Sequence, residues 1–157
     1  MSYEILLFLH VIGACVLLGT GAGIAFFMFV SNRSRDPKMI AHTAGIVVLA
    51  DTVFTATAVV AQPITGYYLA REVGWPIFEG WVAAALLLYL VTGAFWLPVV
   101  WIQLQLKQIA ETAARQNLPL PHRYDRLYRI WVVCGFPAFA AVLAIIWLMI
   151  TKPELGL

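Results

Sequence analysis

Four long stretches of the chain are almost entirely apolar, and charged residues gather between them. The stretches cover about residues 5–30, 39–61, 81–106 and 130–150. A helix of roughly 20 residues crosses the hydrocarbon core of a bilayer, so each stretch is long enough to span it. Lipid offers no partners for backbone polar groups, so spans of this length are expected to be helices. The pattern predicts an all-α integral membrane protein, a four-transmembrane-helix antiparallel bundle forming a single domain over residues 1–157.

Proline and charge spacing refine these boundaries. We expect the second span to stop near Pro63, and Pro98 and Pro137 to kink the third and fourth spans, because proline lacks an N–H. The third helix is expected to continue to Gln116. In that extension Lys107, Glu111 and Arg115 follow one another at i, i+4 spacing, which supports a solvated helix face. Gln103 and Gln105 are expected to be solvated near the interface.

The composition supports a membrane location and excludes several other classes. Hydrophobic residues make up 62% of the chain and charged residues only 11%. A soluble monomer of this size could not bury so much apolar surface. Disorder, coiled coil and nucleic-acid binding are disfavoured by the same figures, and the expected partner is the lipid bilayer. Cys15 and Cys134 lie in apolar runs, so no disulfide is expected.

Lys and Arg are distributed unevenly between the two sides of the predicted bundle. The two loops on one side hold eight of these residues, whereas the other side holds Arg71 and Lys152. By the positive-inside rule the basic loops are cytoplasmic and both termini lie on the outer, periplasmic side. The eight basic residues are Arg33, Arg35, Lys38, Lys107, Arg115, Arg123, Arg126 and Arg129.

His10 is an ionisable residue inside the first span, about 8 Å below the membrane edge at 1.5 Å of rise per residue. Neutral imidazole is a common ligand of haem iron and other metals. Gly13, Ala14 and Gly21 lie near the same helical face and leave room for a flat group. One hypothesis is that His10 binds haem iron and that these three residues seat the porphyrin. The alternative is a histidine hydrogen-bonded to another helix, with the glycines serving close packing.

A second ligand for His10 is not evident within the chain. His42 lies near the opposite membrane edge and His122 lies in a loop. The remaining arrangements are a five-coordinate haem, a second His10 from a symmetry-related copy, or a weaker ligand. Met149 and Tyr89 are the weaker candidates, because they lie in the same half of the membrane. The GxxxG pattern at Gly19–Gly23 predicts a homodimer through the first-helix glycine face.

Asp51 lies near the middle of the second span. It forms a stripe with Thr55, Ala58 and Gln62, which should face the bundle interior. Asp51 is expected to be protonated by desolvation or hydrogen-bonded to threonine. Two roles remain open, a proton relay and a neutral structural residue.

Five segments of the chain carry a family resemblance that covers nearly the whole chain. They resemble a bacterial family of predicted four-helix integral membrane proteins known as a domain of unknown function. That family is more distantly similar to HemJ-type protoporphyrinogen oxidases and CopD-type copper-resistance membrane proteins. HemJ-type proteins have a histidine near the start of the first helix and bind haem b, so the resemblance implies haem ligation by His10. The segments are Leu9–Gly13, Gly19–Met28, Ile46–Asp51, Ala61–Gly66 and Trp96–Trp101.

These observations lead to a functional hypothesis with two alternatives. We expect a haem b-binding protein of the bacterial inner membrane with an electron-transfer or membrane redox role, acting with a redox partner or quinone. If it is an enzyme, it is a membrane oxidoreductase. One alternative is a copper- or small-solute-handling protein like CopD, with His10, Met149 and Tyr89 lining an outer-facing site. The other is a non-catalytic membrane scaffold or accessory subunit.

Overall fold

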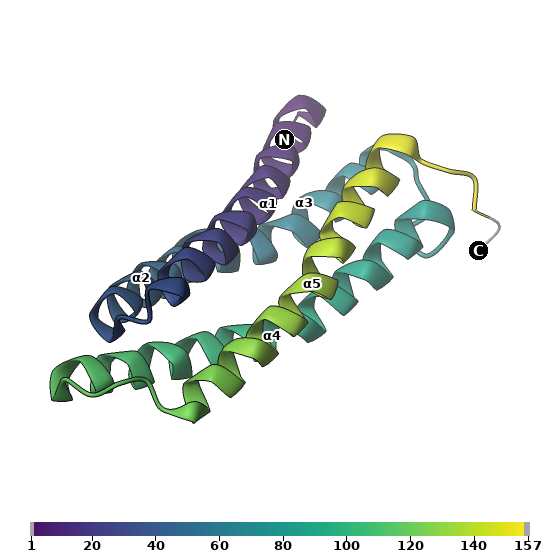
Figure 1. The fold of residues 1–157 in the computed structure, drawn as a ribbon. Coiled ribbons are helices and arrows are strands. Elements are labelled where there is room, and N and C mark those ends of the chain that lie inside the picture. The colour runs from purple at the N-terminus through teal and green to yellow at the C-terminus, as the bar shows by residue number, and fades with distance from the viewer. Residues whose placement is uncertain (1, 156–157) are drawn as a thin grey trace.

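A computed structural model describes residues 2–155 of the chain, and helices account for nearly all of them (Figure 1). The elements are α1 (Tyr3–Ser34), α2 (Pro37–Ala50), the π-helical segment η1 (Asp51–Thr55), α3 (Ala56–Val73), α4 (Gly80–Gln116) and α5 (His122–Thr151). Because α2, η1 and α3 form one continuous helix, the described residues contain four helices long and apolar enough to cross a membrane. The predicted all-α organisation with four spans is confirmed.

The α1–α2 turn and the α4–α5 loop lie together at one end of the bundle, and the start of α1 and the end of α5 lie at the other (Figure 1). We call these the basic end and the terminal end. At the basic end Arg35 donates to the Asp125 carboxylate at 2.6 Å, which joins the two basic loops. This hydrogen bond raises the pKa of Arg35, so its guanidinium stays charged. The basic loops therefore share one end as predicted, and its assignment to the cytoplasm stays a prediction.

Capping residues define the helix ends at the basic end. The Asp36 side chain accepts a hydrogen bond from the Lys38 backbone N–H at 2.9 Å, and Pro37 is the first residue of α2. Asn117 follows α4 in the left-handed conformation, with φ 52°. The third helix thus ends at Gln116, as predicted.

The helices pack as two pairs joined through α2. The most extensive contact is between α4 and α5, α3 packs mainly on α1, and α2 packs on both α1 and α4. The largest cluster of buried side chains lies toward the basic end, where α1, α2, α4 and α5 meet. It includes Met28, Ile40, Leu106, Tyr124 and Trp131. Many large apolar side chains point outward, such as Phe8, Phe27 and Phe136. In a membrane protein these side chains face lipid.

The prediction that the second span stops near Pro63 is wrong, because α3 continues to Val73. Pro63 has no N–H to donate to the carbonyl four residues earlier, which belongs to Val59. The structure supplies a different donor, because the Tyr89 hydroxyl of α4 donates to the Val59 oxygen. In lipid an unpaired carbonyl is costly, and its pairing by a neighbouring helix allows proline inside a span.

The segment η1 widens one turn of the second span at Asp51. The backbone N–H of Ala56 donates to the carbonyl of Asp51, five residues earlier, instead of to the carbonyl four residues earlier. Thr52 lies within this turn and Thr57 lies just after it, and their hydroxyls bond to the carbonyls of Val48 and Val53. The wide turn thus lies in the middle of an apolar helix with its exposed hydroxyls paired. Single π turns of this kind are frequent at functional sites.

The Tyr89 hydrogen bond gives a prediction about stability. Tyr89→Phe should destabilise the fold by about 1–2 kcal/mol, because the Val59 carbonyl loses its donor. In a Pro63→Ala background the backbone regains an N–H that can reach the Val59 carbonyl, so the same substitution should cost much less. Unfolding in detergent or nanodiscs, arranged as a double-mutant cycle, measures the difference. Tyr67→Phe, at a residue that is 46% exposed, is the matched control. Equal costs in both backgrounds would contradict the pairing.

Candidate functional site

The polar stripe predicted on the second span is buried. Asp51, Thr55 and Gln62 are each 5–7% exposed, and Ala58 between them is 5% exposed. Thr65, three residues after Gln62, is also buried, so the stripe is longer than predicted. This extension follows from the continuation of α3 past Pro63. The side that these residues share faces α1, the main packing partner of α3.

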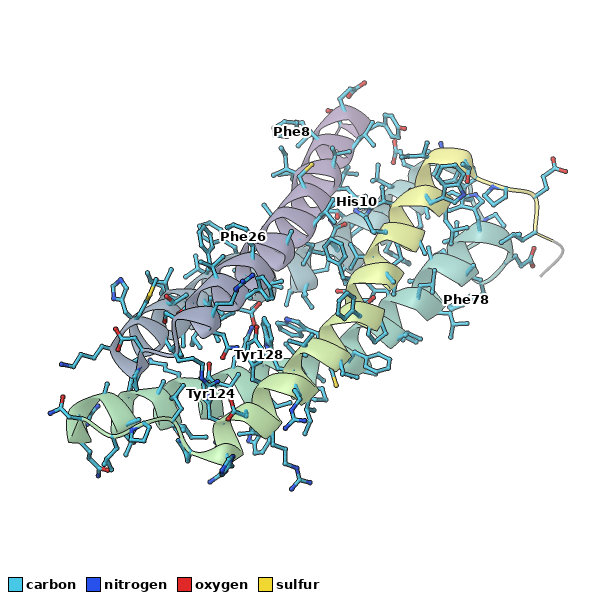
Figure 2. All side chains as sticks on the ribbon, viewed as in Figure 1. Phe8, His10, Phe26, Phe78, Tyr124 and Tyr128 are labelled. Atoms are coloured by element: carbon cyan, nitrogen blue, oxygen red, sulfur yellow. The ribbon has the colours of Figure 1, made fainter. Side chains whose placement is uncertain are left out.

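His10 of α1 meets the far end of this stripe (Figure 2). Its Nδ1 lies 2.8 Å from the Thr65 hydroxyl oxygen. The Thr65 hydroxyl has one hydrogen, which it directs to the backbone carbonyls of Ala61 and Gln62. The Thr65 oxygen must therefore accept from Nδ1–H. This arrangement places a proton on Nδ1, so in the neutral ring the lone pair of Nε2 is free to bind a metal or accept a proton.

Gly66 and Gly13 allow α1 and α3 to approach closely around His10. A Cβ atom on Gly66 would lie 3.1 Å from Cε1 of the His10 ring. A Cβ atom on Gly13 would lie 2.8 Å from Nε2 of the Gln62 amide, and that amide donates to the His10 backbone carbonyl at 2.8 Å. The space expected beside Gly13 for a porphyrin is thus taken by Gln62. The glycines here serve close packing between two helices.

Asp51 is held separately from His10. The Trp96 indole N–H of α4 donates to its carboxyl oxygen at 3.4 Å. Thr55, one turn further along, is 6% exposed, and its hydroxyl has no hydrogen-bond partner in the described protein. Asp51 and Thr65 are fourteen residues apart on one helix, which corresponds to about 20 Å of rise. His10 and Asp51 are therefore two polar layers at different depths, and the carboxyl group does not touch the histidine.

The remaining candidates lie apart from His10 or have other partners. Tyr89 donates its hydroxyl to Val59, and Met149 is half-buried near the end of α5. His42 is exposed near the start of α2. In the part of the chain that the structure describes, no group of three or more His, Cys, Asp or Glu residues could hold a metal ion.

Two further predictions concern Gln103 and the first-helix glycines. Gln103 was expected to be solvated, but only 3% of it is exposed, because α4 packs against α2 and α5 at this depth. Gln105 instead accepts from Arg123 at 3.2 Å. Cβ atoms on Gly19, Gly21 and Gly23 would meet nothing within 4 Å in the described structure. This face packs against no other helix of the described chain, and its use in a dimer stays a prediction.

A cavity at the terminal end lies next to the His10 turn. It has a volume of about 400 Å³ and is lined by Leu6, Tyr68, Arg71 and Glu72. Leu6 is one helical turn before His10, and Tyr68 is three residues after Thr65. Charged side chains thus stand at the membrane edge above the histidine.

Sequence reasoning missed Thr65 and Gly66, which position the ring. Thr65 could have been predicted from the sequence, because it continues the helical spacing of Asp51, Thr55, Ala58 and Gln62. The prediction that the helix ends near Pro63 excluded Thr65 and Gly66 from the stripe.

Comparison with known proteins gives one family match. The model of the family described as "Predicted integral membrane protein (DUF2269)" matches residues 4–153. The match includes all the candidate site residues discussed above and nearly the whole of every span. No curated protein and no solved structure matches the chain.

The tautomer of His10 can be tested directly. In ¹⁵N-histidine NMR of the protein in nanodiscs, His10 should be neutral with its proton on Nδ1. Thr65→Val keeps the side-chain shape but removes the acceptor, so the Nδ1–H form should lose its preference. Thr57→Val is the control, because the Thr57 hydroxyl bonds only to its own helix. A His10 protonated on Nε2 in the unaltered protein would contradict the assignment.

Proposed function

Since this chain belongs to the DUF2269 family of predicted integral membrane proteins, we propose that it acts within the bilayer as a haem b-binding redox protein. In this proposal His10 would hold the haem iron and Asp51 would be a proton site. The membrane is the bacterial inner membrane, with the basic end in the cytoplasm.

The observation that carries the proposal is the orientation of His10. Histidines that bind metals commonly donate their other ring N–H to a protein acceptor, which fixes the tautomer and the ring direction. The Thr65 hydroxyl has this position relative to Nδ1. Gly66 packs against the ring and limits its rotation. Nε2 is therefore presented with a free lone pair, which is what iron ligation requires.

The site offers one nitrogen per chain for a haem iron, which is Nε2 of His10. Tyr89 is engaged with the Val59 carbonyl and does not serve as the sixth ligand. The other two histidines lie in the α2 and α5 turns nearest the basic end. Gln62 occupies the space beside Gly13, so Gly13 would not seat the porphyrin. A second His10 from a dimer mate would complete a bis-histidine site.

The chain's own residues have defined tasks in this proposal. A bound haem b would carry one electron by changing between its ferric and ferrous states. Thr65 keeps the His10 proton on Nδ1, and Gln62 fixes α1 against α3 by its bond to the His10 carbonyl. Asp51, held by Trp96 at the middle of the membrane, takes up and releases a proton. Its distance from His10 makes this a separate step from iron ligation.

Haem binding can be tested by absorption spectroscopy of the purified protein. The unaltered protein should show a Soret band and a reduced α-band, with near-stoichiometric haem in a pyridine haemochrome assay. His10→Ala should lose most of this absorbance, because the iron ligand is absent. Thr65→Val should keep the haem but bind it about tenfold more weakly, as expected when the partner that orients a ligand is removed.

His42→Ala is the matched control, because it removes an exposed histidine from another helix. It should leave the spectrum unchanged. Full haem content in His10→Ala would contradict the assignment. A flat spectrum after haem supplementation would end the haem proposal. Stoichiometric copper in that protein would favour a copper-handling role, and co-purification with a partner subunit would favour an accessory one.

A further inference from the structure

Six buried polar atoms have no hydrogen-bond partner in the described protein, and five of them lie toward the basic end. They are Ser31 Oγ, Asn32 Oδ1, Tyr124 Oη, Tyr128 Oη and Trp131 Nε1. Ser31, Tyr124 and Trp131 are at most 6% exposed. Native proteins pair more than about nine-tenths of their buried polar groups, so five unpaired atoms in one region need a physical explanation.

The three aromatic side chains follow one another on α5, and Ser31 and Asn32 lie on α1, which packs against α5 and runs antiparallel to it. The Arg35–Asp125 ion pair fixes the register between the two helices. One turn inward from that pair, Ser31 on α1 and Tyr128 on α5 reach the same depth. The rings of Tyr124 and Tyr128 stack with centroids 6.3 Å apart, and those of Tyr128 and Trp131 at 5.9 Å. Figure 2 shows both tyrosines between α5 and the α1–α2 side of the bundle.

The chemistry of this group matches water. It offers hydroxyl groups that donate and accept, one indole donor and one amide acceptor. Buried water typically makes about three hydrogen bonds to such otherwise unpaired groups. The ion pair outside the group is reached by solvent, because the side chains of Arg35 and Asp125 are 52% and 31% exposed. Water can therefore reach the group from the basic end.

Another buried polar side chain and an apolar layer lie between the basic end and Asp51. Gln103 of α4, which is 3% exposed, lies seven residues, or about 10 Å, toward the basic end from Trp96, the partner of Asp51. The apolar core side chains Val47 and Val99 lie between the depth of Gln103 and that of Asp51.

We infer that Ser31, Asn32, Tyr124, Tyr128 and Trp131 form a hydrated inlet through which protons from the basic end reach Asp51. This inference rests on the proposed role of Asp51 as a proton site and is independent of haem. Transient water crosses the layer of Val47 and Val99, so proton transfer is slow compared with exchange in the inlet.

Infrared spectroscopy of the protein in nanodiscs tests the inlet. The carbonyl band of a protonated Asp51 is identified by its loss in Asp51→Asn. After transfer to D₂O this band shifts, and the rate of the shift reports proton access to Asp51. The double variant Tyr124→Phe, Tyr128→Phe keeps both rings but removes two hydroxyls of the inlet, so it should slow the shift about tenfold.

Two variants make the result specific. Tyr67→Phe, at the terminal end, should leave the rate unchanged. Gln62→Leu changes the terminal side of Asp51, away from the inlet, and should slow the shift less than the double tyrosine variant. An unchanged rate in the double variant overturns the inlet, and so does a larger effect of Gln62→Leu. If the unaltered protein has no carbonyl band that Asp51→Asn removes, the proton role of Asp51 fails together with the inlet, while the haem assay remains unaffected.

Discussion

The structure depends on one constraint, which is that hydrocarbon offers no hydrogen-bond partner to a polar group. The second span contains a proline, a wide π turn and a line of polar side chains, and each would be costly if left unpaired. Tyr89 pairs the carbonyl that Pro63 leaves free. The exposed Thr52 and Thr57 pair with their own helix. On the second span Asp51, Gln62 and Thr65 are then matched by groups of α1 and α4, so the pairing requirement also affects which helices meet.

The same pairing requirement determines how His10 and Asp51 are held. His10 is held through Thr65 and through the Gln62 amide on its own backbone carbonyl, and Asp51 is held by Trp96. These contacts join α1 to α3 and α4 to η1, so they contribute to assembly of the bundle as well as to the two polar layers. A substitution in either layer therefore alters helix packing and chemistry together. For this reason the variants that keep side-chain shape, such as valine for threonine, are the informative ones.

The sequence was sufficient for the architecture because hydrophobic length and loop charge act locally. The four spans, the extension of α4 to Gln116 and the meeting of the two basic loops all follow from such local patterns. The burial of the Asp51 stripe was also predictable, because spacing along one helix determines which residues share a face. The end of α3 was not, since it depends on Tyr89, a residue of another helix. The filling of the space beside Gly13 by Gln62 is likewise a contact between helices.

The separation of His10 from Asp51 limits what the two residues can do together. At about 20 Å along one helix, the carboxyl group cannot share a proton directly with the imidazole. Thr55 and Gln62 lie on the same buried stripe between them, but the Gln62 amide is committed to the His10 carbonyl. Asp51 can therefore affect His10 only through charge or through the packing of α3. Any coupling between a proton on Asp51 and a ligand on His10 would therefore pass through helix packing, and the wide turn at η1 is the place where α2 and α3 can adjust relative to one another.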